Sequence, residues 1–171
     1  MLEERGYRVL SISLRPNDGS VSIGRLVGQL QQTIDQTIPP QDEIALIGFS
    51  MGGLVGRSYV QELEGWRRVN QLLTIATPNS GTTSARLLGA TAGAEMTPGS
   101  PLLRSLNVER LREFRRIQHG AMYSTLDGVI WPSASGRLPS GWNQTVPAVI
   151  HGNLLRNAAV LQHTLRYLQL G

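Results

Sequence analysis

The spacing of apolar residues near the N-terminus predicts a strand followed by a helix. Residues 7–14 read Tyr-Arg-Val-Leu-Ser-Ile-Ser-Leu, a partly alternating segment rich in strand formers, and a turn sequence with proline and glycine follows at 15–19. Between residues 22 and 38 apolar positions recur every three or four residues, which is the spacing of one helix face, and two prolines then end the pattern. We therefore expect a strand and a crossover helix.

The rest of the chain continues this alternation. Residues 43–48 form a nearly continuous apolar run, typical of a strand buried on both faces of a parallel sheet. The pattern further predicts a helix at 52–64, strands at 69–76 and 114–124, and a closing helix at 153–170. Such alternation predicts an α/β fold, in which helices cover both faces of a mostly parallel sheet. The length of 171 residues and a hydrophobic content of 40% fit a single domain, residues 1–171.

Residues 79–101 depart from this pattern. They are dense in glycine, threonine, alanine and serine, with only a short apolar piece at 85–88. We expect a loop or a small lid here. An ordinary surface excursion without function is an equal alternative, because loop length alone shows neither mobility nor contact with a substrate.

The composition excludes several classes of chemistry. The chain has no cysteine, which rules out disulfides, thiolate catalysis and Cys-ligated zinc. The N-terminal residues contain no apolar signal-peptide core, and no stretch approaches the roughly 20 apolar residues of a membrane span. We therefore expect a cytoplasmic protein without a transmembrane segment.

All sixteen basic residues are arginine, and the formal net charge is +4. Four arginines cluster at Arg110, Arg112, Arg115 and Arg116. Glutamates are interspersed and aromatic residues are sparse, so this pattern is typical of a solvated helix face that runs into a strand. Binding of nucleic acid or anionic lipid through these arginines is the weaker alternative, and we expect no nucleic-acid partner.

The segment Gly48-Phe-Ser50-Met-Gly52 fits the pattern Gly-x-Ser-x-Gly. A buried-type strand runs into it and a predicted helix runs out of it, and this context lifts a serine above the sheet edge on a sharp turn. The glycines at 52 and 53 let the start of the helix lie close to backbone. Since a serine hydroxyl is a poor nucleophile at neutral pH, it requires a neighbouring base.

The chain resembles lipases and esterases of the α/β-hydrolase superfamily, of the triacylglycerol lipase-like kind. The segments that carry the resemblance are Gly-Tyr-Arg-Val near the start, residues 48–54, Ile-Ala-Thr-Pro-Asn-Ser-Gly-Thr at 75–82, and Ser-Thr-Leu-Asp-Gly-Val-Ile-Trp-Pro at 124–132 with a later histidine. In similar lipases histidine is common where Asn79 stands. The resemblance implies a three-layer αβα sandwich, a serine nucleophile at Ser50, and no metal or organic cofactor.

In this superfamily the catalytic residues follow the order serine, acid, histidine along the chain. Of the three histidines, His119 precedes the candidate acid and His163 lies on the polar side of the last predicted helix, which leaves His151. Asp127 is the only aspartate after Ser50 and would hold the imidazole in the required tautomer. The alternative acids are Glu95, Glu109 and Glu113.

An ester hydrolase of this kind needs two backbone N–H donors for the oxyanion. Met51 supplies the first. In similar lipases the second N–H donor follows a central strand that ends in His-Gly. That strand lies between the strands corresponding to residues 7–14 and 43–48, and the sequence contains no such segment. We therefore expect an N-terminally truncated α/β-hydrolase fold. Either Met1 is not the true start of the protein, or the two strands that flank the missing one pair directly with each other.

The function that these residues predict is hydrolysis of a carboxylic ester, with an apolar acyl group, through an acyl-enzyme on Ser50. The substrate would be a small-molecule or lipid ester, which suggests a place in lipid metabolism. Acyl transfer to a non-water acceptor is one alternative, because the same acyl-enzyme serves both reactions. A catalytically impaired fragment or interaction module that keeps the fold is the other.

Overall fold

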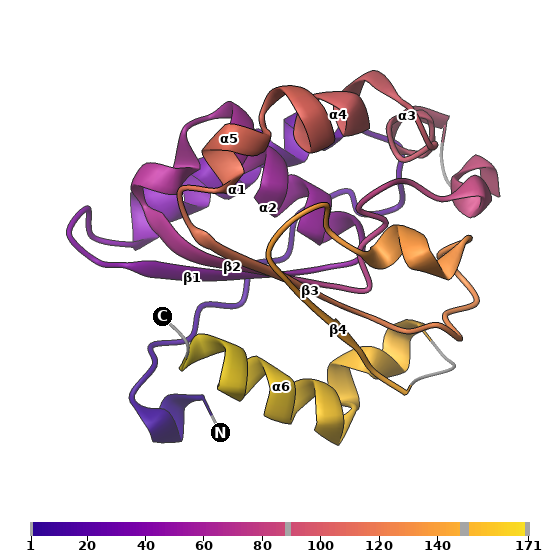
Figure 1. Cartoon of the computed structure of the whole chain (residues 1–171). Coiled ribbons are helices and arrows are strands. Elements are labelled where there is room, and N and C mark those ends of the chain that lie inside the picture. Colours follow the sequence, from indigo (N-terminus) through magenta and orange to yellow (C-terminus); the bar gives the residue numbers. More distant parts are fainter. Residues whose placement is uncertain (1, 88–89, 148–150, 170–171) are drawn as a thin grey trace.

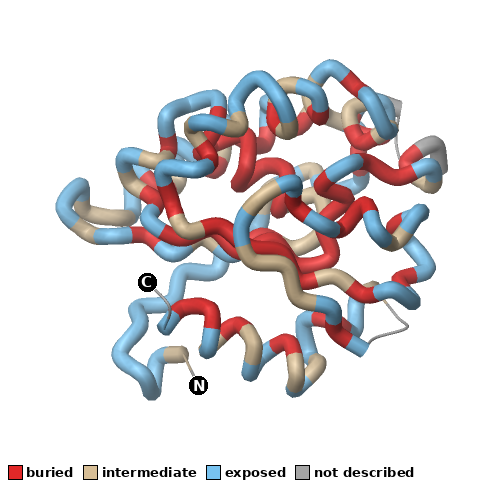
Figure 2. The backbone as a smooth tube through the Cα atoms, in the orientation of Figure 1, coloured by how far each residue is buried: buried red, intermediate tan, exposed pale blue. Residues whose placement is uncertain are grey.

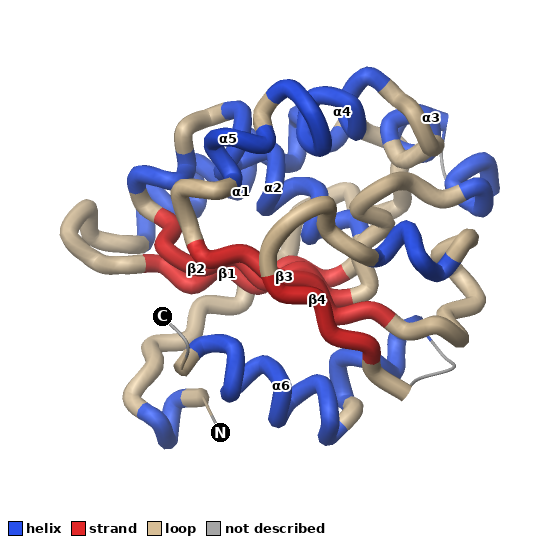
Figure 3. Tube along the Cα trace, viewed as in Figure 1, coloured by secondary structure: helices blue, strands red, loops and turns tan. Residues whose placement is uncertain are grey.

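A four-stranded parallel sheet lies between two helical layers (Figures 1 and 3). The structure is a computed structural model that describes residues 2–87, 90–147 and 151–169. The strands follow the order β1-β2-β3-β4, and each neighbouring pair is parallel. They are β1 (Ile44–Phe49), β2 (Val69–Ile75), β3 (Gln118–Tyr123) and β4 (Trp142–Thr145). The α/β architecture expected from the alternation of elements is confirmed.

One layer contains most of the helices, including the two longest, and the other is formed mainly by the C-terminal helix (Figure 1). The first layer holds α1 (Ile23–Thr37), α2 (Met51–Glu62), α3 (Ala90–Glu95), α4 (Pro101–Arg104) and α5 (Leu111–Phe114), and the opposite layer holds α6 (Ala158–Leu168). Shorter helical turns are η1 (Glu3–Arg5), η2 (Gly65–Arg67), η3 (Thr83–Leu87), the π-helical η4 (Ser105–Glu109), η5 (Ser133–Gly136) and η6 (His151–Arg156).

The helix predicted at 22–38 is present as α1. Ser22 caps it, because its side-chain oxygen accepts from the N–H of Arg25 at 3.2 Å. The apolar positions that predicted the helix are its buried face, namely Ile23, Leu26, Val27, Leu30 and Ile34. The amphipathic pattern therefore predicted both the length of α1 and its buried side.

Each face of the sheet carries its own hydrophobic core. Leu72 and Leu73 are adjacent in β2 and both fully buried, and they belong to opposite cores because strand side chains alternate. The second core is closed by α6, whose Tyr167 hydroxyl donates to the carbonyl of Leu72 at 3.0 Å. Figure 2 shows the buried residues concentrated along the sheet and the facing sides of the helices.

Residues 7–14 do not form the predicted strand. They are extended but lie outside the sheet, and Val9 and Leu10 are 48% and 43% exposed. A strand requires a ladder partner, and β1, the strand at this edge, pairs only with β2 among the described strands. The prediction was wrong because composition reports strand propensity and cannot supply the missing partner.

Three other predictions need correction. The strand expected at 114–124 is shorter, because Phe114 ends the helical turn α5, residues 115–117 form a turn, and only Gln118–Tyr123 enters the sheet. The closing helix predicted at 153–170 is divided into η6 and α6, with Asn157 capping the latter, and residue 170 lies outside the described residues. The expected loop at 79–101 contains the short helices η3 and α3 on either side of residues 88–89, which are also outside the description.

Arg57 is fully buried in α2 and holds three segments together. Its guanidinium donates to the carbonyl of Asn79 at 3.2 Å, to the carbonyl of Leu106 at 3.0 Å and to Oδ1 of Asn107 at 2.8 Å. Burial lowers the pKa of Arg57 to about 9, so the group stays charged at neutral pH. These bonds fix the segment after β2, and with it the wall of the site described below.

We expect Arg57→Met to lower the free energy of unfolding by about 1–3 kcal/mol, because Oδ1 of Asn79 would be left buried without a donor and the partly buried Oδ1 of Asn107 would lose its donor. Urea denaturation measures the loss. Arg104→Met, at an exposed position, is the matched control and should change little. Equal midpoints for the two variants would contradict this account.

The arginines at 110, 112, 115 and 116 are all exposed, as expected of a solvated face. The Arg116 guanidinium lies 4.3 Å from the ring centroid of Trp66, which makes a cation–π contact. Among the described residues, no helix has the length and apolar character needed to cross a membrane.

Candidate active site

Ser50 occupies a strained turn between β1 and α2. Its backbone has φ 52° and ψ −127°, a region that costs a non-glycine residue about 1–3 kcal/mol. The Ser50 N–H donates to the carbonyl of Ile75 at 2.9 Å, and its carbonyl accepts from Gly53 at 3.0 Å. The turn that the motif predicted is therefore present, and it places the serine at the carboxyl end of the sheet.

Two glycines make this turn possible by allowing close backbone contact. A Cβ at Gly48 would lie 2.5 Å from the Cα of Gly53, and one at Gly53 would lie 2.0 Å from Oγ1 of Thr77. A Cβ at Gly52 would meet nothing within 4 Å. The sequence analysis assigned close approach to both Gly52 and Gly53, and only Gly53 has it.

Gly53→Ala should therefore destabilise the protein by about 1–3 kcal/mol, since the added methyl group forces α2 away from Thr77. Gly52→Ala should be neutral or slightly stabilising, because alanine favours a helix and the space is open. Thermal unfolding of the two variants, side by side, tests the assignment. It fails if Gly52→Ala is the more damaging change.

A hydrogen-bonded chain joins three residues that are distant in the sequence. His151 Nε2 lies 2.9 Å from Ser50 Oγ, and His151 Nδ1 lies 2.8 Å from Asp127 Oδ2. A carboxylate can only accept, so Nδ1 carries the proton that donates to Asp127, and Nε2 is free to accept from the serine hydroxyl. The structure thus brings together the three residues that the sequence analysis selected.

Asp127 is held rigidly. Its side chain is 2% exposed, and Oδ1 accepts from the N–H groups of Val129 at 2.8 Å and Ile130 at 3.3 Å. One carboxylate oxygen therefore shapes the loop after β3, and the other faces the imidazole. The ring of Phe49 lies 5.0 Å from that of His151 and packs beside it.

The alternative residues have other roles. His119 lies in β3, bonds to Ser140 Oγ at 2.8 Å, and burial lowers its pKa, so it stays neutral. His163 is on α6 beside Trp142, with ring centroids 6.3 Å apart. Glu95 accepts from the N–H of Ile23 at 2.7 Å, at the start of α1.

The other two glutamates, Glu109 and Glu113, lie in η4 and α5. Residues 148–150, which directly precede His151 in the sequence, lie outside the described residues.

A small pocket of about 150 Å³ adjoins Ser50. Its lining includes Met51, the first residue of α2, whose N–H belongs to the helix terminus and has no acceptor within the helix. The other lining residues are Asn17, Asp18, Gly19, Pro78, Thr82, Met96, Val129 and Ile130. The positive end of the α2 dipole therefore faces the serine, where it favours a negative oxygen.

Sequence analysis missed the loop at 17–19 and Met96 as site residues. One signal could have found the loop: in open α/β sheets, sites form beyond the carboxyl ends of the strands, and this loop follows a segment of strand-like composition. Met96 carries no such signal.

Hydrogen bonds from the side chain and backbone of Ser20 lower the pKa of Asp18, so this exposed carboxylate adds negative charge at the rim of the pocket.

The sequence matches the palmitoyl protein thioesterase family over residues 2–126, a range that contains Ser50 but ends before Asp127 and His151. No curated protein sequence matches the chain. Several solved hydrolase structures share its fold. The mature form of lipase BlEst2 from Bacillus licheniformis has 16% identity and a TM-score of 0.62, with 86% of this chain and 74% of the lipase covered.

Phospholipase PlaB from Legionella pneumophila, in complex with thio-NAD, has 14% identity and a TM-score of 0.70. The match covers 94% of this chain but 49% of the phospholipase, so the chain spans about half of that protein. The α/β-hydrolase MGS-MChE2, from a metagenome of lagoon sediments at Mar Chica in Morocco, has 14% identity and a TM-score of 0.60, with 96% and 78% covered. At these identities the likeness establishes the α/β-hydrolase fold.

Proposed function

Since the chain belongs to the palmitoyl protein thioesterase family of α/β hydrolases, we propose that it cleaves carboxylic esters or thioesters through an acyl-enzyme on Ser50. The observation that carries the proposal is the chain of two hydrogen bonds, of 2.9 and 2.8 Å, from Ser50 Oγ through His151 to Asp127. These contacts support the roles of Ser50 as nucleophile, His151 as base and Asp127 as orienting acid.

The reaction follows from these contacts. Ser50 Oγ attacks the substrate carbonyl carbon while its proton passes to His151 Nε2. The bond to the leaving alcohol or thiol breaks, and His151 returns the proton to it. Water, deprotonated by His151, then attacks the acyl-enzyme and releases the acid and free Ser50. Asp127 stabilises the imidazolium formed in both steps.

The negative oxygen of each tetrahedral intermediate requires donors that are already in place. The Met51 N–H, at the positive end of α2, would supply one of them. A single donor with the helix dipole supports slower turnover than two donors, because each donor is worth about 10²–10³ in turnover. We therefore expect measurable but modest activity from residues 1–171.

The pocket beside Ser50 favours a short acyl group. Its volume of about 150 Å³ is comparable to that of cavities that hold one benzene ring, which are about 150 Å³. We expect kcat/KM for p-nitrophenyl butyrate to exceed that for p-nitrophenyl palmitate by at least about tenfold. A preference for the palmitate would contradict this assignment of the acyl site.

Trapping of the intermediate tests the proposal directly. The protein is mixed with p-nitrophenyl butyrate, quenched in acid and digested, and the peptide that contains Ser50 is examined by mass spectrometry. We expect a butyryl adduct on Ser50 that decays when the quench is delayed. An adduct on another residue would contradict the assignment of Ser50. If neither an adduct nor hydrolysis is detected, the result would favour an interaction module that has the hydrolase fold but no catalytic activity.

A further inference from the structure

The small pocket beside Ser50 has an open end and a buried end. Two of its lining residues, Asp18 and Val129, are exposed to solvent. Two others, Met96 and Ile130, are only 3% and 2% exposed. The exposed residues therefore surround the mouth of the pocket, and the buried apolar residues close its inner end.

The two buried apolar residues belong to different hydrophobic cores. Met96 is part of the core on the α1 side of the sheet, and Ile130 is part of the core that α6 closes. The pocket therefore lies where the two cores meet, and each of these side chains separates it from one of them. Shortening either side chain would extend the pocket into the core behind it.

The two residues differ in how freely their side chains can move. Ile130 is branched at Cβ, which leaves few rotamers, and its N–H donates to Oδ1 of Asp127 at 3.3 Å. A change at this position would also disturb the proposed acid. Met96 is unbranched and has three rotatable bonds, so its side chain adapts to the contents of the pocket.

The main chain around Met96 is held on both sides. The Met96 N–H donates to the carbonyl of Ala92 in α3 at 2.9 Å, and the Met96 carbonyl accepts from the N–H of Thr82 at 2.9 Å. The carboxylate of Glu95, the preceding residue, accepts from the N–H of Ile23 at 2.7 Å. A substitution at position 96 therefore changes the pocket through its side chain, with the backbone wall in place.

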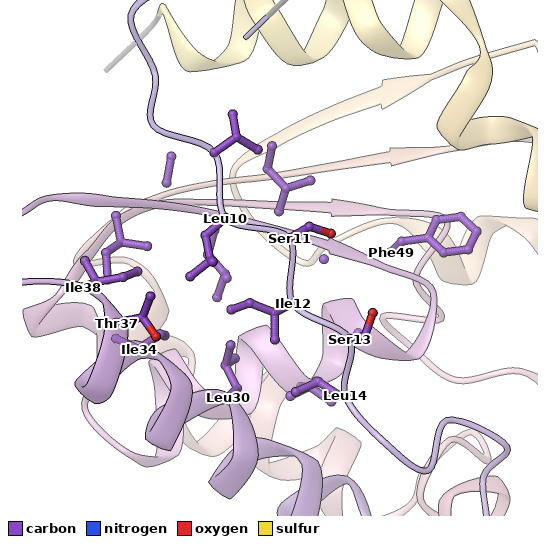
Figure 4. Close-up of a pocket in the computed structure, with 18 of the residues that line it drawn as sticks. Leu10, Ser11, Ile12, Ser13, Leu14, Leu30, Ile34, Thr37, Ile38 and Phe49 are labelled. Carbon is purple, nitrogen blue, oxygen red and sulfur yellow. The ribbon is translucent and has the colours of Figure 1, made fainter. Parts of the chain in front are cut away.

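A second hollow, of about 1240 Å³, lies along the free edge of β1 (Figure 4). Ser50 lines the small pocket but does not line this hollow, so an acyl group on Ser50 Oγ enters the small pocket. Figure 4 also shows residues 10–14 crossing the edge of β1 in front of the hollow. In similar lipases this edge is occupied by the central strand, which makes it a place for polypeptide.

We propose that Met96 sets the longest acyl group that the site accepts, so that the substrates are esters or thioesters of short straight-chain acids. This inference rests on the proposed function, because it concerns the acyl group that Ser50 would carry. With Met96 in place, the pocket of about 150 Å³ ends at the core on the α1 side. Removing the Met96 atoms beyond Cβ opens space for about three more methylene groups.

Chain-length profiles of hydrolysis test the proposal. For the wild type we expect kcat/KM to rise from p-nitrophenyl acetate to the butyrate and to fall again at the heptanoate. Met96→Ala should raise the ratio of heptanoate to butyrate kcat/KM at least about tenfold, because each buried methylene contributes about fourfold. Met96→Val, which keeps more of the core packing, should raise the same ratio by a smaller factor.

Two control variants separate the pocket from its surroundings. Leu106→Ala removes a fully buried side chain of the same core that lines neither cavity. Ile47→Ala enlarges the hollow along β1, which Ile47 lines. Both should leave the heptanoate to butyrate ratio unchanged. An unchanged ratio in both Met96 variants, or an equal rise in either control, would overturn the assignment of Met96.

Binding to the Ser50→Ala protein tests Met96 without any turnover. The ε-methyl NMR signals of Met51 and Met96 report ligands in the pocket, and the signal of Met122, which is fully buried in β3, is the reference. We expect methyl butyrate to shift the first two signals and not the third. In the Ser50→Ala, Met96→Ala protein, read through Met51, the affinity for methyl heptanoate relative to methyl butyrate should rise at least about tenfold.

The two measurements distinguish the failure of this inference from the failure of the proposed function. If the wild type hydrolyses no ester but Met96→Ala changes the relative affinity as expected, the proposed function is wrong and the assignment of Met96 holds. If the relative affinity is the same with and without the Met96 side chain, the assignment of Met96 is wrong, whether or not the wild type hydrolyses esters.

Discussion

Ser50→Ala is expected to reduce kcat for ester hydrolysis on the order of 10⁶-fold and to abolish labelling by a fluorophosphonate probe. The hydroxyl at 2.9 Å from His151 Nε2 is the only atom of this residue that the proposed reaction uses, and alanine removes it without changing the backbone. Alanine and serine both carry a Cβ, so the backbone strain at φ 52° is similar in the two proteins. The variant should therefore remain folded.

Ser58→Ala is the matched control for this change. Ser58 is buried in the same helix, and its hydroxyl has no hydrogen-bond partner among the described residues. Its loss should leave both hydrolysis and labelling unchanged. If Ser50→Ala and Ser58→Ala label equally, the assignment of the nucleophile is wrong.

Asp127→Asn should lower kcat by about 10⁴-fold with little change in KM, because the amide would offer a donor to His151 Nδ1 and stabilise the wrong tautomer. Nε2 would then carry the hydrogen and could not accept the serine proton. The retained Oδ1 can still accept from Val129 and Ile130, so the loop should keep its shape. Steady-state kinetics with urea denaturation separates loss of chemistry from loss of fold.

Asp42→Asn is the control for charge, since Asp42 pairs with Arg8 on the exposed surface at 3.0 Å. It should retain full activity, because an exposed pair contributes little. A similar loss in both variants would mean that Asp127 acts only through the net charge or stability of the protein.

The sequence predicted those parts of the fold that depend on neighbours in the chain. The helix spacing at 22–38 and the apolar runs that became β1 and β2 carry their structure locally, and all appear within one or two residues of the expected bounds. β4 was missed because Trp-Asn-Gln-Thr is short, mostly polar and lies at the sheet edge. Residues 7–14 show the opposite error, since a strand-like composition without a partner forms no ladder.

The sequence also limited the candidate site to few residues, because the chain has three histidines and a single aspartate after Ser50. Their order and the turn motif sufficed to select Ser50, Asp127 and His151. The sequence did not indicate that the loop at 17–19 and Met96 would line the pocket beside them. Those residues come from segments whose meeting depends on how α1 and α3 pack.

The amino-acid sequence by itself determined which segments could become strands and helices and which side chains could react, since both follow from local pattern and residue type. Only the tertiary structure decided that Ser50 and His151, 101 residues apart, lie within hydrogen-bonding distance, and that β1 has an open edge. The reason is physical: hydrogen bonds between strands and between distant side chains exist only after packing has placed their donors and acceptors together.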